Sequence, residues 1–577
     1  MSDNPTAALS KNEVLKQNDP TLGGTLGETL ADPTLACFSS DDEQFLKFHG
    51  IYQQDDRDKR KTGKQYIMMV RARISGGIIP PSQYLVFDDL SERYGNQTLR
   101  ITSRQSFQWH GVVKDKLGPL MKGLNDALCT TIAACGDVNR NVMAPATPAT
   151  SALVARVQED ARRVNDALLP QTGAYHSLWI DGQPLKLTAD EKQAFEDPLY
   201  GKQYLPRKFK IAFAIPPLND TDVYSNCLGF VAIPDRTDPS RPLGYNLLCG
   251  GGLGMSHGNK DTFPRVADVL GYFPADRLVA IAQAVLTAYR DSGDRTNRKH
   301  ARLKYVIAER GAAWFRAEVE ARAGFKLEPA REFKFDRQGD LFGWHRQTDG
   351  PWFLGLFVET GRIKDTPQRQ LKTALRRIVA TFHPEVRLTP SQNLLLTGVT
   401  AEQKDNITAL LAEHGIPVEN QAGAIRRSSM ACPSMPTCGL GLAESERALP
   451  GILDRIEGLL AELELSDEEI IIRMTGCPNG CARPYLAEIG FVGRAPGKYN
   501  LYLGGNAGST QLNREYRASV KVEEIIPVLR PVLTRWKNKR LPGERLGDFC
   551  ARVVWPELTP AGAADVAAPA LNSVTTF

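Results

Sequence analysis

The sequence predicts a mixed α/β (α+β) fold in which two related copies of one unit face each other with pseudo-twofold symmetry in a three-domain arrangement. Segments from the first part of the chain recur, in the same order, in the second part. Residues 99–111 (LRITSRQSFQWHG) match 386–398 (VRLTPSQNLLLTG), and 140–144 (RNVMA) match 427–431 (RSSMA). Both matches have the same offset of 287 residues. Common strand composition alone would not preserve one offset twice.

Periodicity assigns the elements in chain order. Apolar runs bounded by turn residues predict strands at 66–75, 211–216 and 488–493. Helical spacing of apolar residues predicts helices at 275–290 and 451–463. Strands and helices therefore alternate within each copy.

Length and composition exclude several classes of protein. A chain of 577 residues exceeds the size of a single core, so several domains are expected. The net charge of +5 gives no reason to expect a nucleic-acid partner, and no apolar run is long enough for a membrane span. The ten cysteines show no disulfide-like pairing and the N-terminus has no secretory signal, so we expect a cytoplasmic protein.

The first residues of the chain are polar and rich in glycine. On that composition we expect about 35–40 residues to be a mobile extension, and a candidate docking element for a partner.

Four cysteines near the C-terminal end suggest a metal centre. They occur as Cys432 and Cys438 in ACPSMPTC and as Cys477 and Cys481 in TGCPNGC, with C-x5-C and C-x3-C spacings. Four thiolates brought together by turn residues can hold an iron–sulfur cluster. Structural zinc sites usually have C-x2-4-C pairs, so the C-x5-C pair is unusual for zinc, and residues 478–480 make a wide turn; a cluster is therefore favoured over zinc.

Basic residues occur in or beside apolar strands of the first copy, without matching acidic runs. Arg71 and Arg73 alternate on one strand, as Lys208 and Lys210 do on another. Buried charges need partners, so we expect anionic ligands here: a polycarboxylate cofactor, an oxyanion substrate, or both. In our alignment of the copies, TGCPNGC corresponds to the basic run LPRKFK (205–210), so that one copy supplies thiolates and the other cations.

The glycine run GGGLG at 250–254 does not complete a dinucleotide fingerprint, because position 255 is Met255. A turn that lets a flat ligand approach the backbone is an equal alternative.

Six motifs together identify a family. They are FHGIYQQDDRD (48–58), NRNVMAP (139–145), YLPRKFK (204–210), HGNKDT (257–262) and the two cysteine motifs. From about residue 40 to 555 the chain resembles the siroheme sulfite and nitrite reductases, in particular the hemoprotein subunits of the NADPH-linked assimilatory enzymes. The resemblance implies six-electron reduction of sulfite to sulfide for cysteine biosynthesis, at a siroheme coupled to a [4Fe–4S] cluster. It also implies electrons from a separate flavoprotein (FAD/FMN) alpha subunit.

The resemblance also implies roles for individual residues. Cys432, Cys438, Cys477 and Cys481 would hold the cluster, with Cys481 also bound to the siroheme iron. Residues matching the siroheme-binding set are Arg100, Arg104, Gln108, His110, Asn139, Arg207 and Arg302. Residues matching the sulfite-binding and proton-donating set are Arg73, Arg140, Lys208 and Lys210.

The expected domains are an N-terminal extension (1–62), a first ferredoxin-like half-domain (63–133), a cation domain (134–335), a second half-domain (336–408) and a cysteine domain with the tail (409–577). Two alternatives within the family are a siroheme nitrite reductase and a ferredoxin-dependent sulfite reductase. Lys210 favours sulfite, since nitrite reductases of the family tend to lose it. The alternative from another class is a zinc-stapled binding module without catalysis.

Overall fold

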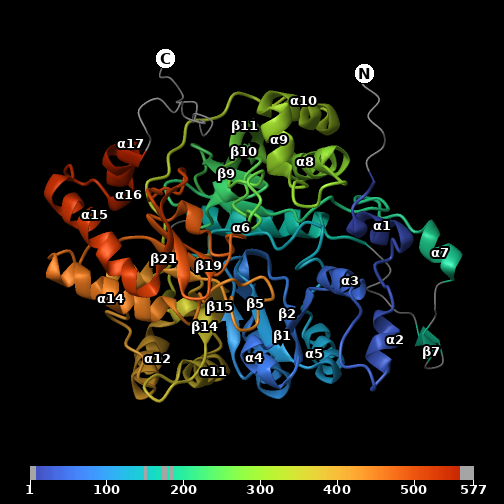
Figure 1. Ribbon diagram of the computed structural model, residues 1–577, viewed down its shortest axis with the longest axis horizontal. Helices are drawn as coiled ribbons and strands as arrows, with labels where there is room; N and C mark the ends of the chain where they lie inside the picture. The colour runs from blue at the N-terminus through green and yellow to red at the C-terminus, as the bar shows by residue number, and fades with distance from the viewer. Residues whose placement is uncertain (1–7, 149–151, 172–178, 181–182, 185–187, 559–577) are drawn as a thin grey trace.

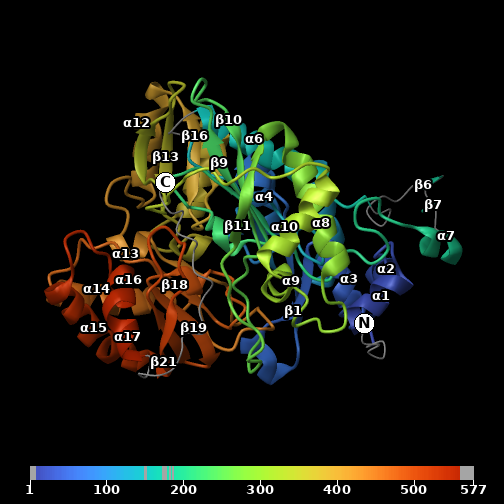
Figure 2. The same cartoon turned by 90° about the horizontal axis from the view of Figure 1, so that it is seen from above.

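The computed structural model describes residues 8–148, 152–171, 179–180, 183–184 and 188–558, and its mixed helices and sheets confirm the predicted fold class (Figures 1 and 2). The Ala- and Pro-rich tail beyond residue 558 and the first seven residues lie outside the described ranges. Four main sheets follow one another along the chain as two related pairs, interleaved as half-domain, copy, half-domain, copy.

The first half-domain is a five-stranded sheet in the order β1-β2-β5-β4-β14. Helices α4 and α5 pack together along it, and the buried Trp109 indole donates to the carbonyl of Phe87 in α4 at 3.1 Å. Its elements are β1 (Ile51–Asp55), β2 (Tyr66–Arg71), α4 (Pro81–Tyr94), β4 (Leu99–Ile101), β5 (Phe107–Val112) and α5 (Lys114–Asp126). The predicted strand 66–75 therefore ends four residues early.

The second half-domain repeats this plan with the sheet order β12-β13-β16-β15-β3. Figure 1 shows the helices of both half-domains along one side of the molecule. Its elements are β12 (Gly343–Arg346), β13 (Trp352–Leu356), α11 (Leu371–Phe382), β15 (Glu385–Leu388), β16 (Leu394–Val399) and α12 (Ala401–Glu413). The offset of 287 maps β5 onto β16 residue for residue.

The half-domains exchange short strands. The strand β3 (Ile78–Ile79) leaves the first half to pair with β15, and β14 (Arg362–Ile363) leaves the second half to pair with β4. Each follows a tight turn that ends in a glycine of positive φ, Gly77 (77°) and Gly361 (76°). A Cβ on Gly77 would lie 2.6 Å from the carbonyl oxygen of Leu388 in the opposite half, so the close crossing requires glycine.

The two larger copies also share one topology, in which a parallel strand pair continues into antiparallel strands. Helices cover the outer face of each sheet, α8 and α10 on the first and α14 and α15 on the second (Figure 1). The first copy contains α6 (Ala152–Ala167), β8 (Ile211–Ala214), β9 (Leu228–Pro234), β10 (Pro242–Cys249), β11 (Asp268–Pro274), α8 (Leu278–Ser292), α9 (Leu303–Arg310) and α10 (Ala312–Ala323). The second contains α13 (Ala424–Arg427), β17 (Met430–Ala431), α14 (Leu449–Glu462), β18 (Ile472–Thr475), β19 (Ile489–Ala495), β20 (Lys498–Leu503), β21 (Arg514–Lys521), α15 (Ile525–Lys539), α16 (Leu546–Phe549) and α17 (Trp555–Leu558). A small hairpin, β6 (Trp179–Ile180) with β7 (Gln183–Pro184), and α7 (Ala189–Ala194) project from the first copy.

The strand ladders correct one sequence alignment. Ile211 pairs with Leu228 as Ile472 pairs with Ile489, so β8 and β18 are equivalent strands. The basic run 205–210 lies before β8. TGCPNGC begins at the last residue of β18 and continues beyond the strand. The alignment of TGCPNGC with LPRKFK was therefore wrong. The two segments lie at opposite ends of equivalent strands.

The predicted mobile extension is also wrong for residues 8–40. Helices α1 (Lys11–Asn18), α2 (Leu26–Ala31) and α3 (Asp42–Phe48) pack against the body, with Leu22 fully buried and Phe38 3% exposed. The charged side chains of Glu13 and Lys16 are buried as well.

Two separate hydrophobic cores divide the molecule. One continuous core joins both half-domains and the first copy, and a second core belongs to the cysteine-bearing copy alone. At the seam between these cores a smaller apolar cluster packs Leu253 of the first copy against Tyr485 and Leu486 of the second. The seam also contains ion pairs: Arg100 bonds Glu446, and Arg473 bonds Asp222. Both cysteine motifs and the cations meet there.

Candidate functional site

A buried cluster of ion pairs lies at the centre of the seam between the two cores. Asp222 accepts from Arg473 at 2.6 Å and also pairs with Arg483. Although burial favours the neutral acid, these two guanidinium groups hold the pKa of Asp222 below its ordinary value. Arg483 also donates to the carbonyls of Ser103 (2.6 Å) and Pro390 (2.9 Å), one in each half-domain. Four parts of the chain are thus fixed at one point.

The four cysteines converge beside this cluster. Cys432 follows β17, and Cys477 and Cys481 follow β18, its parallel neighbour. The Gly476 N–H donates to Cys432 Sγ (3.4 Å), and the Asn479 side chain donates to Cys477 Sγ (3.4 Å). Burial and then the nearby Cys481 raise the pKa values of Cys432, Cys438 and Cys477, the last to about 11. Thiols that destabilise one another's thiolates fit a metal cluster that would neutralise them.

Cys481 differs from the other three because it is exposed. Its surroundings form a cavity that Arg104 and Lys210 reach from the first half-domain and first copy. The remaining lining residues are Ser103, Met143, Ser225, Leu253, Gly254, Asn479, Gly480 and Arg483. A thiol from one copy therefore faces cations from the other parts of the chain. Within the described ranges no three His, Cys, Asp or Glu side chains are grouped tightly enough for a single metal ion.

The two predicted lysines lie at the start of β8, and neither ammonium has a hydrogen-bond or ion-pair partner among the described residues. Burial, followed by the charge of Arg140, lowers the pKa of Lys208 to about 7. Burial, followed by the charge of Lys208, lowers the pKa of Lys210 well below its ordinary value. The nearby Cys481 acts in the opposite direction and offsets a small part of this lowering for both lysines. Lys208 could give up a proton near neutral pH, and the lowered pKa makes Lys210 a readier proton donor than an ordinary lysine.

The two arginines of the first strand have different environments. Arg73 is buried and donates to the carbonyls of Ala133 (3.1 Å), Asn139 (2.8 Å) and Asn165 (3.2 Å). Its guanidinium therefore holds the backbone at three carbonyls. Arg71, which sequence reasoning left out of the site, lies opposite Gln108 in the sheet and stands over the ring of Tyr52 at 5.9 Å.

Arg140 is a second cation close to Tyr52, beside Arg71. Its side chain donates to the carbonyl of Gly136 (3.1 Å) and bonds the Tyr52 hydroxyl, so Tyr52 lies between Arg71 and Arg140. Tyr52 lies within the motif FHGIYQQDDRD, but that motif served only to identify the family and gave Tyr52 no role.

Arg100, expected to hold siroheme, has its three nitrogens occupied. It donates to Glu446 (2.9 Å) and to the Ala431 carbonyl (2.7 Å), and its third nitrogen bonds the Ile101 carbonyl. Arg362 shares the same Glu446 carboxylate. The arginine thus ties β4 to the chain just before Cys432, at 1% exposure.

Other members of the predicted siroheme set keep buried polar atoms without partners. Both side-chain polar atoms of Asn139 are orphaned, as are Arg104 Nε, Arg302 Nε and His110 Nδ1. Burial and then Arg362 lower the pKa of His110 well below its ordinary value, so its imidazole is neutral. The Gln108 amide lies 3.4 Å from His110 Nε2, and its oxygen accepts from Arg71 Nε at 3.1 Å in the orientation that satisfies both of its polar atoms. Buried donors without acceptors are costly, and a ligand with several carboxylates would satisfy them.

The remaining predicted cation, Arg207, lies on the loop before β8. Asp137 is its ion-pair partner, at 3.8 Å. Burial and then the neighbouring Arg298 lower its pKa to about 10, so it stays charged.

The glycines of the run 250–254 pack closely against other parts of the chain. A Cβ on Gly252 would lie 2.8 Å from Arg302 Cζ, and Met255 N–H donates to Pro478 O at 2.9 Å. The run therefore joins Arg302 to the loop of Cys477 and Cys481, which the nucleotide-binding alternative does not explain.

Comparison with known proteins identifies the family. The nitrite and sulphite reductase 4Fe-4S domain matches residues 159–327 and 422–561, and the nitrite/sulfite reductase ferredoxin-like half domain matches 59–127 and 345–414. The chain belongs to the nitrite and sulfite reductase family. Each domain of the family occurs twice, as the internal repeat predicted.

The family's curated members include close relatives over the whole chain. The chain is 46% identical to a "Sulfite reductase [NADPH] hemoprotein beta-component" of Staphylococcus haemolyticus, covering 96% of each sequence. It is also 46% identical to the protein of the same name from Myxococcus xanthus, over 94% of this chain and 96% of that one. The Mycobacterium tuberculosis NirA structure shares the fold, with a TM-score of 0.74 at 23% identity over 94% of this chain and 96% of that one.

These matches confirm the predicted family, the sulfite reductase assignment, and the siroheme and [4Fe–4S] cofactor set. They leave the zinc-stapled module without support. Within the described ranges, no helix is both long enough and apolar enough to cross a membrane.

Proposed function

We propose that this chain is the hemoprotein component of an assimilatory NADPH-dependent sulfite reductase, which reduces sulfite to sulfide for cysteine biosynthesis. The observation that carries the proposal is the exposed Cys481, beside the buried Cys432 and Cys477 and the partly buried Cys438, facing a cavity that contains Lys210 and Arg104. Its relatives of that name match along nearly the whole chain.

The residues present fit both cofactors. Cys432, Cys438, Cys477 and Cys481 would hold the cluster, and Cys481 would be shared with the siroheme iron. Siroheme carboxylates would satisfy Arg104, Asn139 and Arg302, with Gln108 and His110 beside them. Arg207, already paired with Asp137, would be a further cation for them. Arg100 would support the cofactor site without contacting the cofactor, because its pair with Glu446 fixes the strand next to Cys432. When bound, the two groups supply the electrons and the iron at which sulfite reacts.

The chain's own side chains bind the oxyanion and supply protons. Arg71 and Arg140, joined by Tyr52, would neutralise sulfite, with Arg73 keeping Asn139 in place through the backbone. Lys208 and Lys210 would donate protons to the oxygens that leave as water, since burial lowers their pKa values. The lysines are regenerated by uptake of protons from solvent between stages.

The electron donor is proposed to be an NADPH-dependent flavoprotein carrying FAD and FMN, and the compartment to be the cytoplasm. The term "beta-component" in the relatives' names implies a second subunit for those proteins. All ten cysteines are unpaired, as expected in a reducing compartment. We keep the five domain ranges given above as a proposal, supported by their overlap with the family matches.

Steady-state assays test this function. The chain, loaded with siroheme, is assayed with sulfite and with nitrite, using NADPH plus a candidate flavoprotein, reduced ferredoxin, or reduced methyl viologen. We expect a higher kcat/KM for sulfite than for nitrite and turnover with the flavoprotein. A preference for nitrite, or turnover with ferredoxin alone, would favour one of the alternatives within the family.

The Cys481→Ser variant tests the shared thiolate. We expect nearly all sulfite turnover to be lost, together with the spectroscopic coupling between siroheme and cluster, because a serine hydroxyl is a poor ligand for both. Unchanged turnover would refute the assignment.

A further inference from the structure

A second buried charge network lies outside the cavity, at the N-terminal helix α1. The Lys16 ammonium donates to Glu13 Oε1 at 2.6 Å and to the carbonyl of Leu205 at 2.8 Å, and it lies 3.7 Å from Asp137 Oδ2. The side chains of Lys16 and Glu13 are only 2% and 1% exposed. Buried ion pairs are costly to assemble, so a purely structural contact would be served as well by apolar residues.

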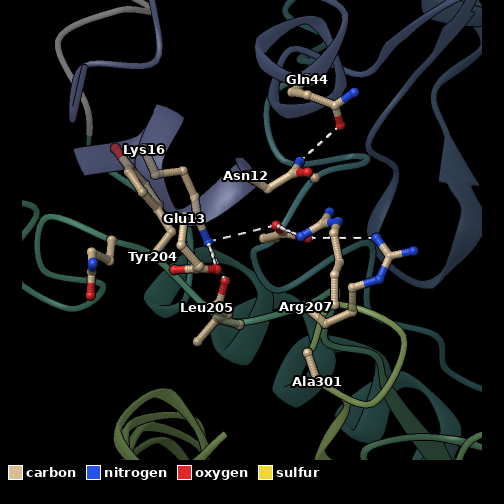
Figure 3. Close-up of polar contacts among 12 residues, drawn as sticks. Asn12, Glu13, Lys16, Gln44, Tyr204, Leu205, Arg207 and Ala301 are labelled. Carbon is tan, nitrogen blue, oxygen red and sulfur yellow. Dashed lines mark hydrogen bonds and ion pairs between the residues drawn. The ribbon is translucent and has the colours of Figure 1, made fainter. Parts of the chain in front are cut away.

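The network continues directly to the loop 204–210, which carries Arg207, Lys208 and Lys210 (Figure 3). Asp137 accepts two bonds from Arg298, at 2.7 and 3.0 Å, and lies 3.8 Å from Arg207 Nη1. Glu13 also accepts from Arg295 (2.5 Å), which in turn donates to the Tyr204 carbonyl at 2.8 Å. Two consecutive carbonyls of the loop are thus fixed, one directly and one indirectly, by the same helix.

The loop needs such anchors. Residues 202–208 belong to no helix or strand, and Tyr204 has a φ of 54°, an uncommon conformation for a bulky residue. The Tyr204 hydroxyl donates to the Pro20 carbonyl at 2.9 Å, again within the N-terminal segment. Arg207 and Lys208 follow within four residues of this anchored turn.

We propose that Glu13 and Lys16 are positioning residues that hold the loop 204–210, which carries Arg207 and Lys208 and brings Lys210 to the cavity. The N-terminal segment then supports the active site from outside the cavity. This inference rests on the proposed function, because it concerns the cations that the function uses.

The test is Lys16→Met in the full-length, siroheme-loaded protein, assayed with reduced methyl viologen so that no partner subunit takes part. We expect the KM for sulfite to rise about tenfold, because small displacements of charged groups at a reaction centre have effects of this order. We also expect an altered visible spectrum of the bound siroheme, since Arg207 would move with the loop. The matched control is Lys11→Met in the same helix, whose exposed pair with Asp41 should leave both readouts unchanged.

Two further variants keep the test decisive. Lys16→Arg retains the charge and should recover much of the lost affinity for sulfite. Glu13→Gln keeps the side-chain size and removes the charge that pairs with Arg295, so it serves if Lys16→Met does not fold. A Lys16→Met protein with a lower melting temperature but wild-type KM and spectrum overturns the inference. If the wild type itself does not reduce sulfite, the proposed function fails, and the siroheme spectrum still decides the role of the helix.

Discussion

Arg71 and Arg73 differ in what surrounds their guanidinium groups. Three backbone carbonyls accept from Arg73, whereas Arg71 stands over the Tyr52 ring and shares a strand pair with Gln108. Alternation on one strand could identify the pair but could not rank its members, because the carbonyls come from distant parts of the chain. On these contacts we propose binding for Arg71 and anchoring for Arg73.

Replacing each arginine by glutamine should separate these roles. Arg71→Gln should raise the KM for sulfite with little change in stability. Arg73→Gln should lower the free energy of unfolding by about 1–3 kcal/mol, because buried carbonyls lose their donors. Chemical denaturation and steady-state kinetics on both variants would measure this. Equal kinetic effects at similar stability would contradict the assignment.

The lysines predict a pH dependence. Lys208, with its pKa lowered to about 7, donates only in its protonated form. The rate should therefore be full below this pKa and fall as the pH rises through it, and anions bound nearby shift the fall upward. We expect the kcat/KM for sulfite to show an alkaline limb at or above about pH 7 that is absent or displaced in Lys208→Met. If the alkaline limb is unchanged in Lys208→Met, the titration of a group other than Lys208 causes it.

At the scale of elements, the glycine run 250–254 is a connector. Gly252 leaves room for the Arg302 guanidinium, and Met255 bonds the loop that carries Cys477 and Cys481. The run was visible in the sequence, but its purpose was not, since the neighbours that fill the space come from α9 and from the other copy.

Gly252→Ala should displace Arg302, because the new Cβ would lie 2.8 Å from its Cζ. We expect lower siroheme content after purification, measured by absorbance per protein. The control is Gly451→Ala in α14, where nothing lies within 4 Å of the new Cβ and a gain of about 0.5–1 kcal/mol in stability is expected. Full siroheme content in Gly252→Ala would show that Arg302 tolerates the shift.

Periodicity predicted two strands and two helices of the copies, and each prediction lies within three residues of the observed ends of β8, β19, α8 or α14. The register between TGCPNGC and LPRKFK could not, because no residues match there and only the ladder between β8 and β9 fixes it. The packed N-terminal segment was also missed. Its composition is polar, and its few apolar anchors, such as Leu22 and Phe38, are widely spaced.

At the scale of the whole molecule, the duplication was readable, but the strand exchange was not. Strands of two residues, such as β3 and β14, carry no periodicity. They nevertheless make each half-domain sheet depend on the other half, so that we expect the two halves to unfold together.

Ile363→Ala tests this dependence. Ile363 is fully buried and pairs with Leu99 in the first half-domain, so its truncation should cost about 2–5 kcal/mol. Hydrogen exchange should then accelerate in β4 and β5, which are more than 250 residues away in sequence. An increase confined to β12–β16 would contradict the coupling. Leu541→Ala, at a 54% exposed position, is the control.

The ion pair at the centre of the seam bears on the origin of the duplication. Asp222 and Arg483 precede equivalent short helical turns, 223–225 and 484–486, and both adopt a positive φ, 48° and 55°. In an ancestral homodimer with true twofold symmetry, one residue type would have met itself at this place. Two aspartates or two arginines would have repelled each other there. The attraction between opposite charges could arise only once duplication let the two copies mutate separately, so this contact is younger than the duplication.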